Sequence, residues 1–140
     1  MYRKAVQIIF VLLALNFLGG AALAQNTGHI FTTFQDGTTV NANIYPSKDA
    51  VFLNGGPQNH SAKGLPDGTY YFQVTDPNGS VLLSTDGVAC RQLQVINEIV
   101  AGSTGPACKH ANGSTNSNNG GSIPVQLIPL DRKSVCRERV

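Results

Sequence analysis

Charge and large aromatic side chains are scarce in this 140-residue chain. It has no Trp, only 7% of its residues are aromatic, and only 13% are charged. Between residues 25 and 130, four basic residues stand against six acidic ones, a net charge of −2. A nucleic-acid-binding surface needs clustered Lys and Arg to neutralise phosphates. The sequence therefore gives no support for nucleic-acid binding.

Sequence motifs of catalysis are also missing. There is no Gly-x-Ser-x-Gly elbow and no His-Glu-x-x-His pair, and Glu98 is the only Glu between residues 25 and 130. A Ser-His-Asp set drawn from Ser61, His60 and Asp67 would rest on adjacency alone, which is not triad geometry. We expect a non-enzyme without cofactor or metal. The three histidines are His29, His60 and His110.

Three aspartates precede Gly or Pro, where aspartate ordinarily caps a turn: Asp67, Asp76 and Asp86. The turn interpretation is favoured for all three. A carboxylate pair of Asp67 and Asp86 in one cleft stays open as an alternative. A loose calcium site at Asp76, Asn78 and Asp86 is another, although the spacing of an EF-hand is absent.

The N-terminus predicts export. Two basic residues precede an apolar run over residues 5–18, and small residues follow at 22 and 24. This is typical of a signal peptide, here a helix within residues 1–24, cleaved between Ala24 and Gln25. The run is shorter than the roughly 20 residues of a membrane span, so an uncleaved anchor is the lesser alternative. We expect a secreted, periplasmic or cell-surface protein with no membrane association after cleavage.

The last ten residues, 131–140, differ in composition from the rest and hold four basic residues. This decapeptide resembles the translation of a short-read sequencing adapter. We expect it to be non-native and the native chain to continue past Leu130. A genuine basic tail for an anionic partner is the alternative.

Two cysteines lie in the expected mature chain. Disulfides persist in oxidising compartments, so we predict a Cys90–Cys108 bond, which would contribute on the order of 3 kcal/mol. Cys136 falls in the doubtful tail. The alternative is a metal site of Cys90, Cys108 and His110, which lacks a fourth ligand.

Short apolar segments separated by turn residues predict an all-β chain. In the segment 64–79, Tyr70, Phe72 and Val74 alternate with polar neighbours, between Pro-Asp-Gly and Asp-Pro-Asn-Gly turns. Residues 92–100 predict a strand, or a hairpin turning at Asn97-Glu98. The expected strands are 29–34, 39–45, 50–53, 69–75, 80–84, 92–100 and 123–128, with an antiparallel hairpin joining 69–75 to 80–84.

Six to seven such strands predict an antiparallel β-sandwich over residues 25–130, with a small up-and-down barrel as the alternative. The Asn/Gly/Ser-rich residues 111–122 predict a mobile loop, since they cannot bury surface that would offset ordering entropy. A binding loop is the alternative.

The pattern Gly-Leu-Pro-x-Gly-Thr-Tyr at residues 64–70 resembles prealbumin-like modules of bacterial surface proteins, including Cna-B-type and carboxypeptidase-regulatory-like repeats. The span 51–130 is similar to exported bacterial proteins that carry the same pattern. The resemblance implies an Ig-like or prealbumin-like, non-catalytic sandwich used in stalks, adhesion or substrate contact. The Lys–Asn crosslink of some such modules is not carried over, because Lys48 and Lys63 stand beside turn residues.

These observations together predict a structural, adhesive or binding module at the cell envelope or outside the cell, and a fragment of a longer surface protein. Its partners would be further domains of the same polypeptide or extracellular material. The alternative is a small secreted protein that binds carbohydrate or peptide. Tyr45, Tyr70 and Tyr71 could contact a glycan, but packing in the sheets is favoured for Tyr70 and Tyr71.

Overall fold

The computed structural model describes residues 28–57, 62–106 and 108–131. These residues are mostly β, with three short 3-10 helices and no α-helix among them. None of their helices is long and apolar enough to cross a membrane. The predicted signal peptide and its cleavage site between Ala24 and Gln25 lie outside this part of the chain. So do residues 132–140 of the C-terminal tail.

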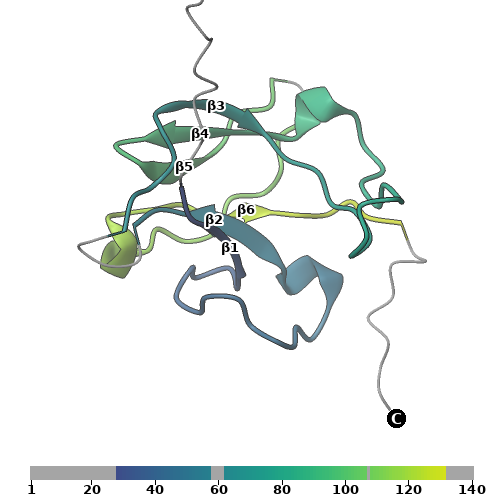
Figure 1. Ribbon diagram of the computed structural model, residues 1–140, viewed down its shortest axis with the longest axis horizontal. Coiled ribbons are helices and arrows are strands. Elements are labelled where there is room, and N and C mark those ends of the chain that lie inside the picture. The colour runs from purple at the N-terminus through teal and green to yellow at the C-terminus, as the bar shows by residue number, and fades with distance from the viewer. Residues whose placement is uncertain (1–27, 58–61, 107, 132–140) are drawn as a thin grey trace, which may run out of the picture.

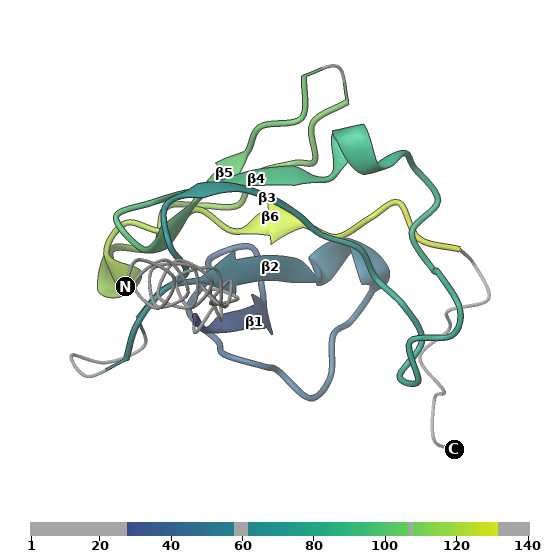
Figure 2. The ribbon, with the colours of Figure 1, turned by 45° about the horizontal axis from the view of Figure 1, so that its top comes forward.

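The strands form two antiparallel three-stranded sheets, consistent with the predicted β-sandwich. Figures 1 and 2 show the sheets as two layers, with β3, β4 and β5 on one side and β1 and β2 on the other. One sheet has the order β1 (Ile30–Thr33), β2 (Phe52–Gly55), β6 (Val125–Gln126). The other has the order β3 (Gly68–Tyr71), β4 (Gln92–Ile96), β5 (Ile99–Ser103).

The core lies between the sheets and follows the period of two that strands impose. Leu93 and Val95 of β4 are buried and alternate with half-buried glutamines. They pack with Val100 of β5 and with Val125 of β6, which belongs to the opposite sheet. Burying each such side chain contributes roughly 1.5–3 kcal/mol. This shared cluster joins the two layers.

The β4–β5 connection confirms the hairpin alternative for residues 92–100. Ile96 pairs with Ile99, so Asn97 and Glu98 form a two-residue turn. Both have positive φ, 52° and 66°. This is the backbone of the tight turns whose twist matches antiparallel strands, and Asn tolerates it well.

The strand expected at 39–45 is wrong. These residues form a loop on the outer side of β1 and β2, seen beneath those strands in both ribbon views. Asn41 has φ 49°, and its backbone N–H donates to the Thr32 carbonyl at 2.7 Å. Its side-chain oxygen accepts from the Thr32 N–H at 3.2 Å. These bonds to a β1 residue nine positions earlier reverse the chain where an extended strand was expected.

The strand 69–75 is also shorter than predicted, and 80–84 is not a strand. β3 ends at Tyr71, and beyond it only isolated bridges join Thr75 to Leu82 and Ser84 to Leu130. The antiparallel connection itself is present, because the Asp76 N–H donates to the Val81 carbonyl at 2.9 Å. The turn chemistry was predicted correctly, but the length of the ladder beyond it was not.

Residues 111–122 have defined contacts, contrary to the expectation of a loop that buries nothing. Asn116 is 6% exposed and Ser122 is fully buried. Asn112 and Asn116 form isolated bridges with Val125 and Ser122. A 3-10 turn at Ser117–Asn119 ends at Gly120, whose φ is 62°. Asn116 Nδ2 donates to the Gly37 carbonyl, and Ser122 Oγ accepts from the Asn54 and Asn119 side-chain amides. Polar side chains are thus buried here through hydrogen bonds, a route that an argument from apolar surface does not consider.

Candidate functional site

A buried ionic cluster joins Asp86, Arg91 and His110. Arg91 Nε donates to Asp86 Oδ1 at 2.5 Å, and His110 Nε2 lies 2.8 Å from Asp86 Oδ2. The Arg91 and His110 side chains are each 2% exposed, and that of Asp86 is 18% exposed. One carboxylate therefore bridges two basic side chains that are almost wholly out of solvent.

The disulfide brings these residues together. Cys90 and Cys108 are bonded in the structure, as the sequence predicts, with Cα atoms 4.8 Å apart. Arg91 directly follows one cysteine, and His110 stands two residues beyond the other. The bond thus holds the two basic side chains near each other, beside Asp86. Both sulfur atoms are used, so the alternative metal site of two thiolates and His110 is not available.

The hydrogen bonds in the cluster set its electrostatics. Burial opposes ionisation of Asp86 and is the largest single influence on its pKa. The hydrogen bonds from His110 and Arg91 nevertheless lower that pKa below its usual value. The other ring nitrogen of His110, Nδ1, lies 2.6 Å from the Gln126 carbonyl oxygen. A ring carrying both protons satisfies both contacts and leaves no nitrogen free to accept a proton from a substrate.

The same cluster fastens the C-terminal part of the described chain. Arg91 Nη1 donates to the Leu127 carbonyl at 3.2 Å, and Nη2 donates to the Pro129 carbonyl at 2.6 Å. The guanidinium lies 5.4 Å from the centre of the Phe72 ring, and His110 meets that ring edge-on at 5.0 Å. The planar fork of Arg suits such a many-partner site. The arrangement is a structural clamp on residues 126–129.

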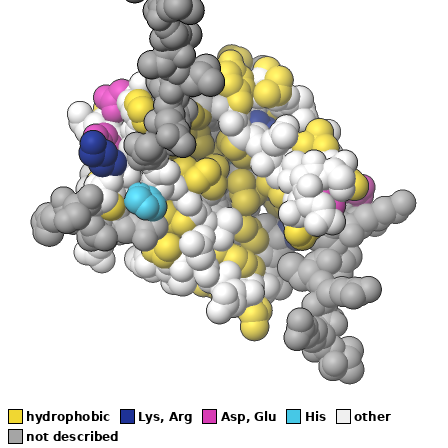
Figure 3. Space-filling view, viewed as in Figure 1, with side chains coloured by type: hydrophobic (Ala, Val, Ile, Leu, Met, Phe, Trp, Pro, Cys, Tyr) yellow, Lys and Arg dark blue, Asp and Glu magenta, His cyan; other side chains and the backbone are white. Residues whose placement is uncertain are grey.

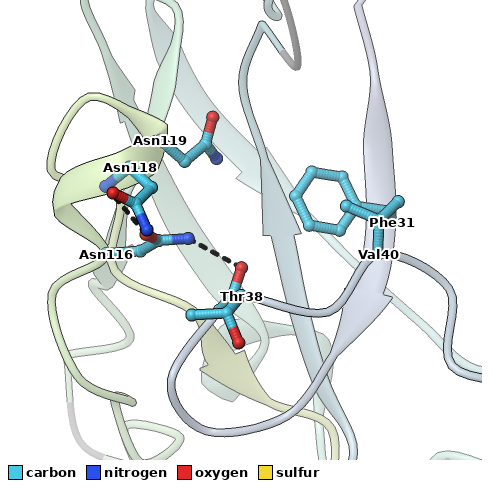
Figure 4. Close-up of a pocket in the computed structure, with 7 residues that line it drawn as sticks. Phe31, Thr38, Val40, Asn116, Asn118 and Asn119 are labelled. Carbon is cyan, nitrogen blue, oxygen red and sulfur yellow. Dashed lines mark hydrogen bonds between the residues drawn. The ribbon is translucent and has the colours of Figure 1, made fainter.

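A second region is a small polar pocket between the 37–40 loop and the 3-10 turn at Ser117–Asn119. Its volume is about 170 Å³. Figure 4 shows the Asn side chains on one side and Phe31 with Val40 on the other. The lining consists of Phe31, Gly37, Thr38, Val40, Asn116, Asn118 and Asn119. Among the described residues, no charged side chain lines it.

A third region is an open seam between the sheets, with a volume of about 430 Å³. Ile30 of edge strand β1 and Tyr71 of edge strand β3 lie at its mouth, 57% and 60% exposed. Figure 3 shows hydrophobic side chains gathered along the middle of this face, with charged side chains toward its margins. The rest of the lining consists of Phe72 and of Thr32, Leu53, Gln73, Val74, Thr75 and Leu127.

The turn interpretation holds for one of the three aspartates. The Asp76 carboxylate accepts hydrogen bonds from the Ser80 and Val81 N–H groups. These bonds lower the pKa of Asp76, the bond from Val81 most, although desolvation opposes them. Asp67 instead accepts from the distant Glu98 N–H at 3.0 Å. Asp86, expected to cap a turn, belongs to the ionic cluster, so that expectation is wrong. Asp86 and Asp67 bind different partners and do not form a carboxylate pair.

The other candidate residues are scattered. His29 is exposed, and its Nδ1 lies 3.2 Å from the Lys63 carbonyl oxygen. Tyr70 packs against the core, as expected. Tyr71 lies on the opposite face and is 60% exposed, so the expectation that it packs in the sheets is wrong. Tyr45 packs against Phe34 with ring centres 4.9 Å apart. His60 and Ser61 lie outside the described residues, so the Ser-His-Asp set that they would form with Asp67 stays untested.

Reasoning from the sequence missed the ionic cluster. His110 belongs to no catalytic motif in the sequence, yet it is 6% exposed and bonded on both ring nitrogens. One signal could have found it: Arg91 and His110 flank the two paired cysteines, in a segment with few other charges. Comparisons of the chain with family models, with curated proteins and with solved structures found no match.

Proposed function

We propose that the chain is an exported, non-catalytic β-sandwich module of Ig-like or prealbumin-like type. Its role would be structural, adhesive or binding, at the cell envelope or outside the cell, within a longer surface protein. Its partners would be neighbouring domains of that protein or extracellular material.

The observation that supports this proposal is the commitment of the Asp86–Arg91–His110 cluster to the fold. Both ring nitrogens of His110 and both carboxylate oxygens of Asp86 already have partners. A general base needs a free acceptor of suitable basicity within reach of a substrate proton. Neither ring nitrogen of His110 is free, and the hydrogen bonds from His110 and Arg91 lower the pKa of Asp86, which makes it a weaker base. The cluster instead ties a disulfide-closed loop to the C-terminal segment, as a stalk or adhesive domain requires for rigidity outside the cell.

Two measurements test the module. The gene should be read across the codons for Leu130 and Asp131 from long, adapter-free reads; we expect the frame to continue into further turn-and-strand sequence. The full chain should then be expressed in a bacterial host, fractionated and sequenced from its N-terminus. A mature end at Gln25 in the periplasm, medium or envelope supports export, whereas a cytoplasmic protein that keeps residue 1 contradicts it.

Catalysis is tested on the same material. The folded, disulfide-bonded chain should be assayed with ester, peptide and glycoside substrates. We expect no turnover above a heat-denatured sample. Turnover that co-purifies with the folded chain through two separations would contradict the non-catalytic assignment.

A second candidate function is a small secreted ligand-binding protein. The observation in its favour is the uncharged pocket of Figure 4, which combines amide side chains with an apolar wall. Recognition of a neutral polar ligand needs both.

A further inference from the structure

We propose, building on the binding role suggested above, that the pocket between the 37–40 loop and the Ser117–Asn119 turn holds one neutral sugar ring of a glycan. The pocket joins segments nearly 80 residues apart in the sequence. Its suitability follows from a buried floor, from polar groups without internal partners, and from the absence of charge.

The floor of the pocket is held in place by hydrogen bonds. Asn116, 6% exposed, donates through Nδ2 to the Gly37 carbonyl at 2.7 Å and accepts through Oδ1 from the Asn118 N–H at 3.0 Å. The buried Asn116 amide therefore connects the 37–40 loop to the Ser117–Asn119 turn (Figure 4). Gly37 has φ 72°, and a Cβ there would lie only 3.0 Å from Pro124. Such a preformed floor reduces the ordering entropy that binding would otherwise cost.

The rim supplies unused hydrogen-bonding groups. Within the described part of the chain, the exposed Asn118 side-chain amide makes no hydrogen bond of its own. Asn119 Nδ2 donates to Ser122 Oγ at 3.0 Å, which leaves its Oδ1 able to accept. Thr38 Oγ1 donates to Asp36 Oδ2 at 2.9 Å, so its oxygen can still accept from a ligand. The pocket thus offers one amide donor beside several acceptors.

This set of groups matches a sugar hydroxyl, which donates and accepts at the same oxygen. Sugars also present an apolar C–H face. Val40, 43% exposed, provides an apolar wall opposite the amides, together with the edge of Phe31, which is 4% exposed. The part of the chain that the structure describes contributes no Lys, Arg or His to the lining that could pair with a phosphate or carboxylate ligand. A neutral, hydroxyl-rich ring can hydrogen-bond to the amide side chains and at the same time place its C–H face against the apolar wall.

The size of the pocket limits the ligand to a single ring. Its volume of about 170 Å³ lies well below the roughly 300–1,000 Å³ of pockets for drug-sized ligands. So small a contact gives weak affinity, and we expect dissociation constants of about 1 mM or higher. Repeated domains of a surface protein would strengthen such contacts through multivalency.

The test is an NMR titration of the full chain, exported in a bacterial host, with methyl glycosides of glucose, galactose, mannose and N-acetylglucosamine. We expect at least one glycoside to shift the amide signals of Gly37, Thr38 and residues 116–120 in a saturable way. Asn118→Ala should raise the dissociation constant about 3- to 10-fold, from loss of one to two hydrogen bonds. Asn43→Ala, an exposed Asn outside the pocket lining, is the matched control and should bind as the wild type does.

Each other outcome overturns the assignment. If no glycoside shifts these amides, or if Asn118→Ala binds with unchanged affinity, the pocket is not a sugar site. Shifts confined to Ile30 and Tyr71 would move the site to the seam between the sheets while keeping the binding role. Export and envelope localisation are measured separately, so loss of the sugar site leaves the module proposal standing. The amide spectrum of each variant also shows whether it is folded.

Discussion

Replacing Asp86 by Asn tests the ionic cluster most directly. The substitution keeps the shape of the side chain but leaves one oxygen where two now accept, from Arg91 Nε and from His110 Nε2. One charge-assisted bond, worth about 1.5–3 kcal/mol, is lost, and a donor then faces the new NH₂ group. Breaking a buried pair typically costs about 3–5 kcal/mol. Asp86 is 18% exposed, so we take the lower end, about 3 kcal/mol.

The assay is urea unfolding at pH 7 with the disulfide intact. A loss of about 3 kcal/mol is a large part of the 5–15 kcal/mol by which typical domains are stable. It would lower the melting temperature by at least about 10 °C in a domain of this length. Asp49→Asn, at an exposed aspartate outside the cluster, is the matched control and should change stability by no more than about 0.5 kcal/mol. An Asp86→Asn loss below about 1 kcal/mol would refute the clamp.

The pH dependence of the same two proteins supplies an independent check. The pKa of Asp86 is lowered from 3.8, so its contribution is complete above that value. As pH falls below about 4, the unfolded chain takes up the proton first, and stability declines through the lower folded pKa. The difference in free energy of unfolding between the wild type and Asp86→Asn should therefore become smaller below about pH 4. The lowered pKa of Asp76 makes the stability of both proteins fall in acid by the same amount, so its effect cancels when the two stabilities are subtracted.

Further perturbations test the rest of the framework. Replacing Cys90 and Cys108 together by Ala opens a loop between residues 18 apart and should cost about 3 kcal/mol, measured by urea unfolding against the wild type with its disulfide intact; an unchanged free energy of unfolding would contradict this. Gly64→Ala should prevent folding or cost more than about 2 kcal/mol, because its Cβ would collide with the Glu98 carbonyl; a wild-type melting curve would contradict this. Asn97→Gly should leave stability unchanged or raise it by a few tenths of a kcal/mol, since φ is positive there; a loss above about 1 kcal/mol would be inconsistent.

Local signals in the sequence predicted the all-β class, the Asn97-Glu98 hairpin, the turn at Asp76 and the pairing of Cys90 with Cys108. The first three depend on a few neighbouring residues, through alternation with period two or turn residues that tolerate positive φ. The cysteine pairing depends on setting the third cysteine, Cys136, aside with the doubtful tail. The same alternation places Tyr70 and Tyr71 on opposite faces of β3, with Tyr70 partly buried against the core. These features need no knowledge of what packs against them.

Long-range contacts decided the rest. The 39–45 segment alternates like a strand, yet Asn41 bonds to Thr32 and the chain turns away. Asn116 looked like part of a mobile loop, but a carbonyl 79 positions earlier gives its amide a buried partner. Asp86, Arg91 and His110 each resemble ordinary surface residues until the disulfide brings them together. Composition and spacing say which groups a chain has, whereas burial and pairing of polar groups depend on what the fold places opposite them.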